Sequence, residues 1–165
     1  MQLGESFVGT GAEAAHVNTV LGAREGPVGQ AWATALATPS AGHAPFVVVL
    51  QPGLPVVPFT LFVNKARIEG DDHGRLTWGA AQAGVATGVA DAVAAGTIAE
   101  DAAGDLALIV AVWVDPDARQ EDLVFANNRE ATAGALALGR AGLPRAADVL
   151  EQRDEAWNPY FRPPG

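Results

Sequence analysis

The longest strongly apolar run in the chain reads Leu106-Ala107-Leu108-Ile109-Val110-Ala111-Val112-Trp113-Val114 and lies between Asp105 and Asp115. A helix needs about 20 such residues to span a bilayer, so this run is too short for a membrane segment. A short apolar run with polar borders is typical of a buried strand. We therefore interpret it as the central strand of a sheet, around which the other elements are arranged.

Helical patterns precede and follow this strand. Residues 79–95 carry Val85, Val89 and Val93 at i, i+4 spacing, and Gly96 provides the stop that glycine often gives a helix. The many alanines and glycines of this segment allow neighbouring backbones to approach closely. The other helices are expected at Pro27–Thr38, Gln120–Leu138 and Ala146–Gln152.

Four further segments are interpreted as strands. Gly9-Thr10-Gly11 joins the first two, and we interpret it as a hairpin turn rather than a phosphate loop, because a third glycine and a directly following helix are missing. The continuously apolar run at 46–50 is typical of a strand buried on both faces. Strands and helices in this order predict one α/β (α+β) domain over residues 1–165, a β-sheet covered by helices. The expected strands are Glu5–Val8, Ala14–Leu21, Phe46–Leu50 and Thr60–Ile68.

Composition excludes several classes of function. The 165 residues suffice for one compact domain, and 19 acidic against 10 basic residues give a formal charge of −9. This charge repels nucleic-acid phosphates and anionic lipids, so neither nucleic acid nor membrane is an expected partner. The absence of cysteine excludes disulfides, thiolate catalysis and cysteine–zinc sites, and the three histidines lack metal-ligand spacing, so no metal is expected. Residues 1–6 show no signal-peptide pattern, which predicts a cytoplasmic location.

Polar groups in apolar surroundings mark a candidate site. His16 is one imidazole in an otherwise apolar strand, and in a strand it projects from the same face as Asn18. Lys65 and Arg67 are likewise two residues apart. If the two strands border one cleft, it gathers an imidazole, an amide, an ammonium and a guanidinium group. Gln82 is expected in the first turn of its helix, where free backbone N–H groups point outward.

Fragments spread over nearly the whole chain carry a family resemblance. The fragments are Gly4-Glu5, Gly42-His43, Val63-Asn64-Lys65, Ala81-Gln82, Ala90-Asp91, Gly96, Asp105-Leu106, Asn128, Glu130-Ala131-Thr132 and Asn158-Pro159. In their order and spacing the chain resembles the formaldehyde-activating enzyme family, whose members condense formaldehyde with tetrahydromethanopterin to methylene-tetrahydromethanopterin. The resemblance implies a lyase of formaldehyde detoxification and one-carbon metabolism that dehydrates a carbinolamine.

The same resemblance implies a fold and an assembly. The fold would be similar to the second domain of ribosomal protein S5, and the chain would form a homopentamer. The substrates would be formaldehyde and a reduced pterin, with tetrahydromethanopterin as co-substrate and no tightly bound cofactor.

The resemblance also implies roles for individual residues. His16 matches the catalytic histidine, which would protonate the departing hydroxyl. Lys65 and Gln82 match ligand-binding residues, and Val47 stands where the family has an apolar contact. From its chemistry alone, Lys65 could also extend from a strand end into solvent or, if desolvated, form a Schiff base with an aldehyde. We favour ligand binding.

Two matches fail. Asn18 stands where the family carries aspartate, and Arg67 stands where it carries a small hydroxyl residue; Asp115-Pro116-Asp117 also replaces a His-Trp-Glu segment. Losing a carboxylate and gaining a cation both disfavour an imidazolium and a developing iminium. Three functions stay open: the family reaction with Asn18 and Arg67 as substrate contacts, condensation of an aldehyde with a different amine, and non-catalytic sensing of formaldehyde or a pterin.

The remaining polar and aromatic residues are given structural interpretations. Arg67 is expected to pair with Glu69. The tail around Trp157–Phe161 resembles a docking arm more than a helix. Loop positions are expected for His43 and His73, and core positions for Trp78 and Trp113.

Overall fold

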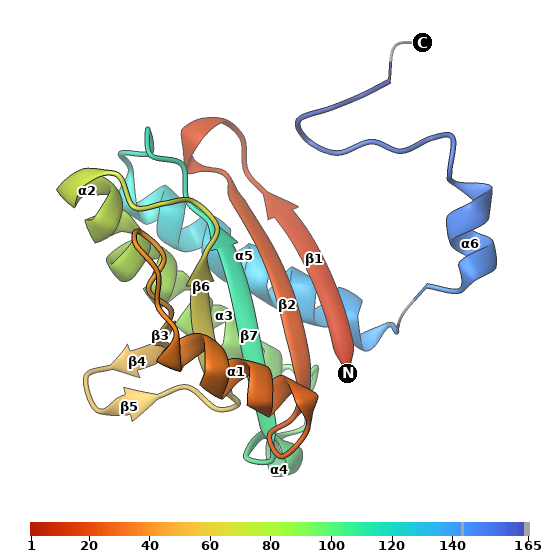
Figure 1. Ribbon diagram of the computed structural model, residues 1–165, viewed down its shortest axis with the longest axis horizontal. Coiled ribbons are helices and arrows are strands. Elements are labelled where there is room, and N and C mark those ends of the chain that lie inside the picture. Colours follow the sequence, from red (N-terminus) through yellow and green to blue (C-terminus); the bar gives the residue numbers. More distant parts are fainter. Residues whose placement is uncertain (143, 164–165) are drawn as a thin grey trace.

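Five strands form a mixed sheet in the order β1-β2-β7-β6-β3 (Figure 1). The computed structural model describes residues 1–142 and 144–163 of the chain. Strand β7 pairs antiparallel with β2 and parallel with β6, which confirms the central position expected for it. A separate two-stranded ribbon, β4-β5, extends from the sheet. The strands are β1 (Gln2–Val8), β2 (Ala15–Ala23), β3 (Phe46–Val47), β4 (Val49–Gln51), β5 (Leu54–Pro55), β6 (Phe59–Asn64) and β7 (Leu106–Trp113).

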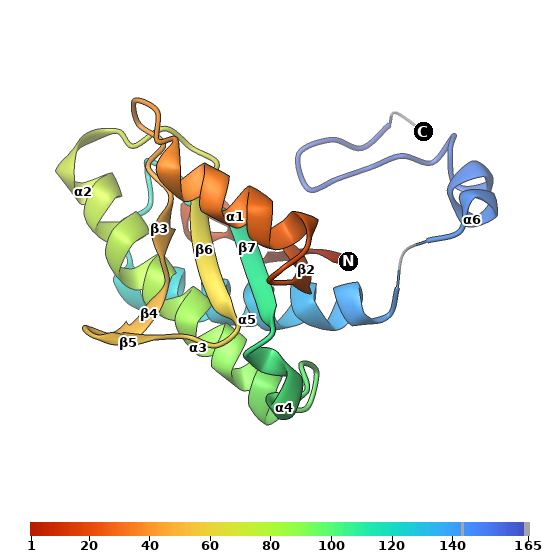
Figure 2. The ribbon, with the colours of Figure 1, turned by 60° about the horizontal axis from the view of Figure 1, so that its bottom comes forward.

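Helices lie on both faces of the sheet, which confirms the mixed fold class. Figure 2 shows α1 crossing one face while α3 and α5 lie against the other. Within the described ranges, no helix is long and apolar enough to cross a membrane. The helices are η1 (a 3-10 turn, Gly11–Glu13), α1 (Pro27–Ala37), α2 (Gly70–Arg75), η2 (a π-helical segment, Leu76–Ala81), α3 (Gln82–Ala94), α4 (Glu100–Ala103), α5 (Glu121–Arg140) and α6 (Ala146–Glu151).

The core lies between the sheet and the α3–α5 layer. Alternate residues of β2, such as Ala15, Val17 and Leu21, are buried in it, so the residues between them face the other way. Small residues permit the close approach of the two helices: a Cβ at Gly84 or Gly88 would collide with the backbone of α5. The sheet face that carries His16 is therefore the one away from this core.

Two of the expected strands are shorter than predicted. The segment 60–68 leaves the sheet after Asn64, because the buried Asn64 amide donates to the carbonyls of Gly42 and Ala66 and fixes a turn there. The run 46–50 divides into β3 and β4, and Val48 is its one fully buried residue, so this run is not buried on both faces. Its apolar surface faces a pocket instead.

The helix expected at 79–95 begins earlier, because α2 and η2 lead directly into α3. Gln82 therefore lies inside a continuous helical segment, and the prediction that it sits in a first turn is wrong. His73 lies in α2 and not in a loop; it is buried, with Nε2 3.0 Å from the Val114 carbonyl and Nδ1 accepting from the Glu69 N–H. It is a structural histidine that joins α2 to the end of β7.

The C-terminal arm, which we define as α6 and the segment 152–163, stands apart from the sheet and helices in both views (Figure 1). Its Trp157, Tyr160 and Phe161 are more than half exposed. The arm turns back to place the Tyr160 ring edge-on against Phe7 of β1, with ring centroids 5.8 Å apart. An exposed aromatic segment thus touches the body of the domain beside one strand.

Candidate active site

One end of the outward sheet face is left uncovered. Helix α1 closes the far end of β2, where Val28 packs over Gly22. His16 lies at the other end of the same strand, next to the β1–β2 turn (Figure 1). Its cross-strand neighbours are Phe7 on β1 and Trp113 on β7. Trp113 is half-buried beside His16 and so is not the core residue expected from the sequence.

A carboxylate contacts His16. Oε1 of Glu5 lies 2.8 Å from Nε2 of His16, and the two side chains are 55% and 27% exposed, respectively. The carboxylate is not aligned for a hydrogen bond with the ring nitrogen, so Nε2 of His16 is left without a hydrogen-bond partner among the described residues. The ring is also tilted against Phe7, with centroids 5.8 Å apart. Glu5 and His16 form an acid–base pair at the edge of the uncovered face.

Lys65 approaches His16 from the β6 side of the sheet, opposite to the β1 side on which Glu5 lies. It follows β6 directly, and its backbone N–H donates to the Val112 carbonyl, which places it beside Trp113. Its Nζ donates to the backbone oxygen of His16 at 3.1 Å. Burial lowers the pKa of Lys65 to about 8, and the Glu5 charge acts against this by raising it. The ammonium of Lys65 therefore loses its proton more readily than that of an exposed lysine.

The two departures from the family pattern lie in different places. Asn18 is the cross-strand partner of Glu5, so it borders the cluster. Arg67 lies beyond the end of β6, is exposed and packs over Gly42. Among the described residues, the ion pairs do not include Arg67, so the expected pair with Glu69 is not formed. The structure thus brings His16, Asn18 and Lys65 to one end of the sheet and places Arg67 in the loop after β6.

Glu5 is the residue that sequence reasoning missed. Its position in the pattern Gly4-Glu5 was recognised, but no contact was assigned to it. In the structure Val8 pairs with Ala15 and Glu5 pairs with Asn18, a register that the expected strand bounds, Glu5–Val8 and Ala14–Leu21, do not supply. In an antiparallel pair such neighbours share a face, so Glu5 had to lie on the face of His16.

Val47 and Gln82 lie in a separate pocket of about 440 Å³, which we call the Trp78 pocket. Oε1 of Gln82 accepts the Val49 N–H at 2.6 Å, which ties α3 to β4. Trp78 is 55% exposed, contrary to the core position expected for it. The pocket is lined by Ala44, Pro45, Phe46, Val47, Val49, Trp78 and Gln82. It offers apolar and aromatic surface without an ionisable group.

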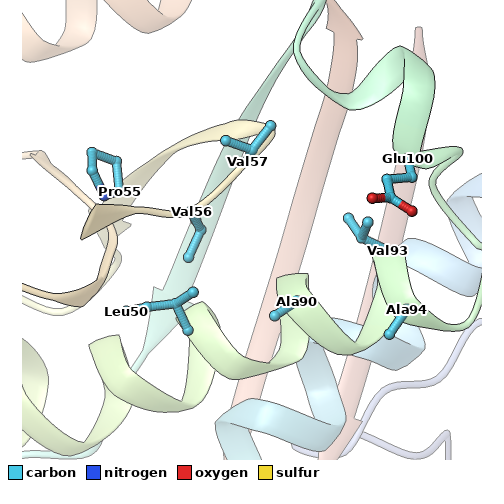
Figure 3. A pocket seen from close by; sticks show the side chains of 8 residues that line it. All are labelled: Leu50, Pro55, Val56, Val57, Ala90, Val93, Ala94 and Glu100. Carbon is cyan, nitrogen blue, oxygen red and sulfur yellow. The ribbon is translucent and has the colours of Figure 1, made fainter.

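A further pocket is unrelated to this chemistry. It has a volume of about 490 Å³ and lies between the β4–β5 ribbon and α3 (Figure 3). Its lining is aliphatic apart from Glu100 of α4, and it contains none of the residues predicted for the site. The described part of the chain also holds no group of three histidines and carboxylates placed to bind a metal. The Glu5–His16–Lys65 cluster is therefore the best candidate for acid–base work.

Comparison with known proteins agrees with these observations. A family model described as formaldehyde-activating enzyme (Fae) matches residues 3–161. The chain is 40% identical over 158 residues to a 5,6,7,8-tetrahydromethanopterin hydro-lyase of Methanosarcina barkeri, covering 96% of this chain and 89% of the relative. It is 41% identical over 156 residues to a bifunctional enzyme Fae/Hps of Methanococcoides burtonii, covering 94% of this chain but 39% of that relative. It thus spans most of the first relative and about two fifths of the second.

Proposed function

Because this chain belongs to the formaldehyde-activating enzyme family and is an enzyme that condenses formaldehyde with tetrahydromethanopterin, we propose that the reaction takes place at the Glu5–His16–Lys65 cluster. The observation that carries this assignment is the 2.8 Å contact between Glu5 and His16 on the uncovered end of the sheet. The catalytic unit is the whole chain, residues 1–165, with formaldehyde and the reduced pterin as substrates.

His16 acts as the proton donor. A pterin nitrogen adds to formaldehyde and gives a carbinolamine, whose hydroxyl must take a proton before it leaves as water. An imidazole exchanges protons readily near neutral pH, and a positioned acid of this kind contributes about 10²–10⁴-fold. The Glu5 carboxylate lies 2.8 Å from this ring, and its charge stabilises the iminium cation that forms as water departs. Asn18 keeps the geometry of this face but lacks the charge of an aspartate.

The pterin is positioned by the Trp78 pocket and the edge of the cluster. Val47 and Trp78 supply apolar and aromatic surface, and Gln82 supplies a polar group beside it. Lys65 binds substrate next to His16, and Arg67 contacts the outer part of the pterin from the loop after β6. Since formaldehyde adds to amines without a catalyst, holding the two substrates together contributes much of the acceleration.

We infer that the enzyme assembles as a homopentamer and that it is located in the cytoplasm. Many large apolar side chains are exposed on the single chain, among them Leu50, Leu54, Trp157 and Phe161. Apolar surface on this scale marks a site of association. The C-terminal arm, which stands apart from the body, docks against a neighbouring subunit. Native mass spectrometry that gives only monomer at micromolar concentration would contradict the assembly.

The test of function is the rate of formaldehyde-dependent methylene-tetrahydromethanopterin formation, with spontaneous condensation subtracted. Tetrahydrofolate and a simple secondary amine serve as alternative acceptors. Acceleration with tetrahydromethanopterin supports the proposal. If the protein accelerates the reaction only with another acceptor, the proposal is replaced by the hypothesis that the chain, with Asn18 and Arg67, condenses formaldehyde with a different amine. If the protein binds formaldehyde or a pterin but accelerates no reaction, its function is non-catalytic sensing of that ligand.

A further inference from the structure

Lys65 is the single lysine of the chain. The other nine of its ten basic residues are arginines, and there is no cysteine. A guanidinium stays protonated in proteins and does not add to an aldehyde, whereas a neutral lysine amine does. The one side-chain amine able to capture an aldehyde therefore lies in the candidate active site of an enzyme that handles formaldehyde.

The setting of Lys65 suits a nucleophile. Its Nζ is half-buried and held 3.1 Å from the backbone oxygen of His16. The Glu5 carboxylate acts on the Lys65 ammonium by its charge, and it lies 2.8 Å from the His16 imidazole, a group that can give and take up a proton. Hydrogen bonding to a carbonyl needs only a donor, which arginine also carries. With its pKa lowered to about 8 by burial, the amine of Lys65 is partly neutral near pH 7.

We propose that Lys65 carries formaldehyde covalently, as a methylene iminium on Nζ, before the carbon passes to the acceptor amine. This rests on the proposed function and names the residue that holds the formaldehyde carbon. Nothing is oxidised or reduced at any step, because formaldehyde keeps its oxidation level from carbinolamine to transferred methylene.

The proposed transfer consists of addition, loss of water and passage of the methylene carbon to the acceptor. The Nζ lone pair forms a C–N bond to formaldehyde, the C=O pair moves to oxygen, and a proton passes from nitrogen to oxygen to give a carbinolamine. Protonated His16 gives its proton to the hydroxyl, the C–O bond breaks, and water leaves an iminium on Lys65. The acceptor nitrogen then bonds to the methylene carbon and passes its proton to Nζ. The C–Nζ bond breaks, its pair returns to Nζ, and the methylene stays on the acceptor.

The experiment traps this iminium. The purified protein is mixed with formaldehyde and cyanoborohydride, which converts an iminium to an N-methyl group, and peptides are read by mass spectrometry. Arg24→Lys supplies the matched control, because Arg24 is exposed and lies just past the other end of the strand that carries His16. In that variant, Lys65 and an ordinary surface lysine compete within one molecule.

We expect Lys65 to be methylated at least about tenfold faster than the introduced lysine near neutral pH, since a lowered pKa enlarges its neutral fraction. The rate should rise up to about pH 8 and then level off, whereas that of the control keeps rising. Tetrahydromethanopterin added before the reductant should discharge the methylene and prevent labelling. Lys65→Arg, which keeps the charge, should bring condensation down to the spontaneous rate.

Equal labelling of the two lysines, labelling that the acceptor leaves unchanged, or full condensation activity in Lys65→Arg would each overturn the covalent role. These results leave the proposed function standing if the wild type still accelerates condensation. The reverse pattern, fast labelling of Lys65 with discharge only to another amine, supports the covalent role and overturns tetrahydromethanopterin as acceptor.

Discussion

The Glu5–His16–Lys65 cluster and the Trp78 pocket differ in the chemistry they offer. In the cluster, Glu5 of β1 lies 2.8 Å from the His16 imidazole of β2, and Nζ of Lys65, after the end of β6, donates to the backbone oxygen of His16 at 3.1 Å. The Trp78 pocket has no ionisable group in its lining, and its main polar side chain, Gln82, is engaged with the Val49 N–H. The residues that a family resemblance groups as one site thus divide into an ionisable part and an apolar part, and we propose that the first moves protons and the second holds the pterin ring. Substitutions in the first should change kcat, and those in the second should change KM.

The largest effect is expected for His16→Ala. Removing the proton donor should lower kcat for condensation by about 10²-fold or more, the usual scale for general acid–base catalysis. The ring is partly exposed and is not part of the core, so the variant should unfold at nearly the wild-type temperature. Initial rates above the spontaneous background and thermal unfolding check both statements. An unchanged kcat would make His16 a structural residue.

A smaller and different effect is expected for Gln82→Ala. The Val49 N–H would lose its acceptor, which costs about 1–3 kcal/mol where the group stays unsatisfied, and the wall of the Trp78 pocket would loosen. KM for the pterin should rise by roughly tenfold, the factor that corresponds to about 1.4 kcal/mol of binding, while kcat changes little. Saturation kinetics separate the two constants. A fall in kcat at unchanged KM would mean that the pocket takes part in the chemistry.

The smallest effects concern the two departures from the family pattern. Asn18→Asp adds a charge opposite Glu5 and should raise kcat by no more than about tenfold, because Glu5 already supplies a carboxylate. Arg67→Thr should change kcat by less than about twofold, since a surface charge outside the cluster is screened by solvent. If Asn18→Asp slows the reaction, the amide suits the chain's own substrate. A large gain from Arg67→Thr would place that guanidinium nearer the reacting carbon than its position indicates.

Much of the fold follows from local pattern. The central strand, the helix beginning at Pro27, the helix at 120–138 and the C-terminal end of the helix at 79–95 agree with the prediction to within a few residues, because apolar runs, Pro27 and Gly96 act locally. The failures have tertiary causes. The Asn64 amide ends β6 through contacts to Gly42 and Ala66, and the helical start at Gly70 depends on His73 reaching the end of β7.

The candidate site is likewise predictable only where it depends on a local pattern. The period of a strand correctly set His16 and Asn18 on one face, but it assumed that Lys65 and Arg67 were also in a strand. Glu5 could be assigned only through the register of β1 with β2, which is a pairwise property of two segments. The separation of Val47 and Gln82 from the cluster depends on the full three-dimensional arrangement and has no local signature.

The coupling between Glu5 and His16 tests the central claim most directly. The measurement is a double-mutant cycle on kcat/KM with the wild type, Glu5→Gln, His16→Ala and the double variant, spontaneous condensation being subtracted. If Glu5 acts through His16, Glu5→Gln alone should lower the rate by roughly tenfold, equivalent to about 1.4 kcal/mol, and should cost nothing further once His16 is alanine. If the two losses multiply in the double variant, the residues act independently, and the account of a Glu5–His16 acid–base pair is wrong.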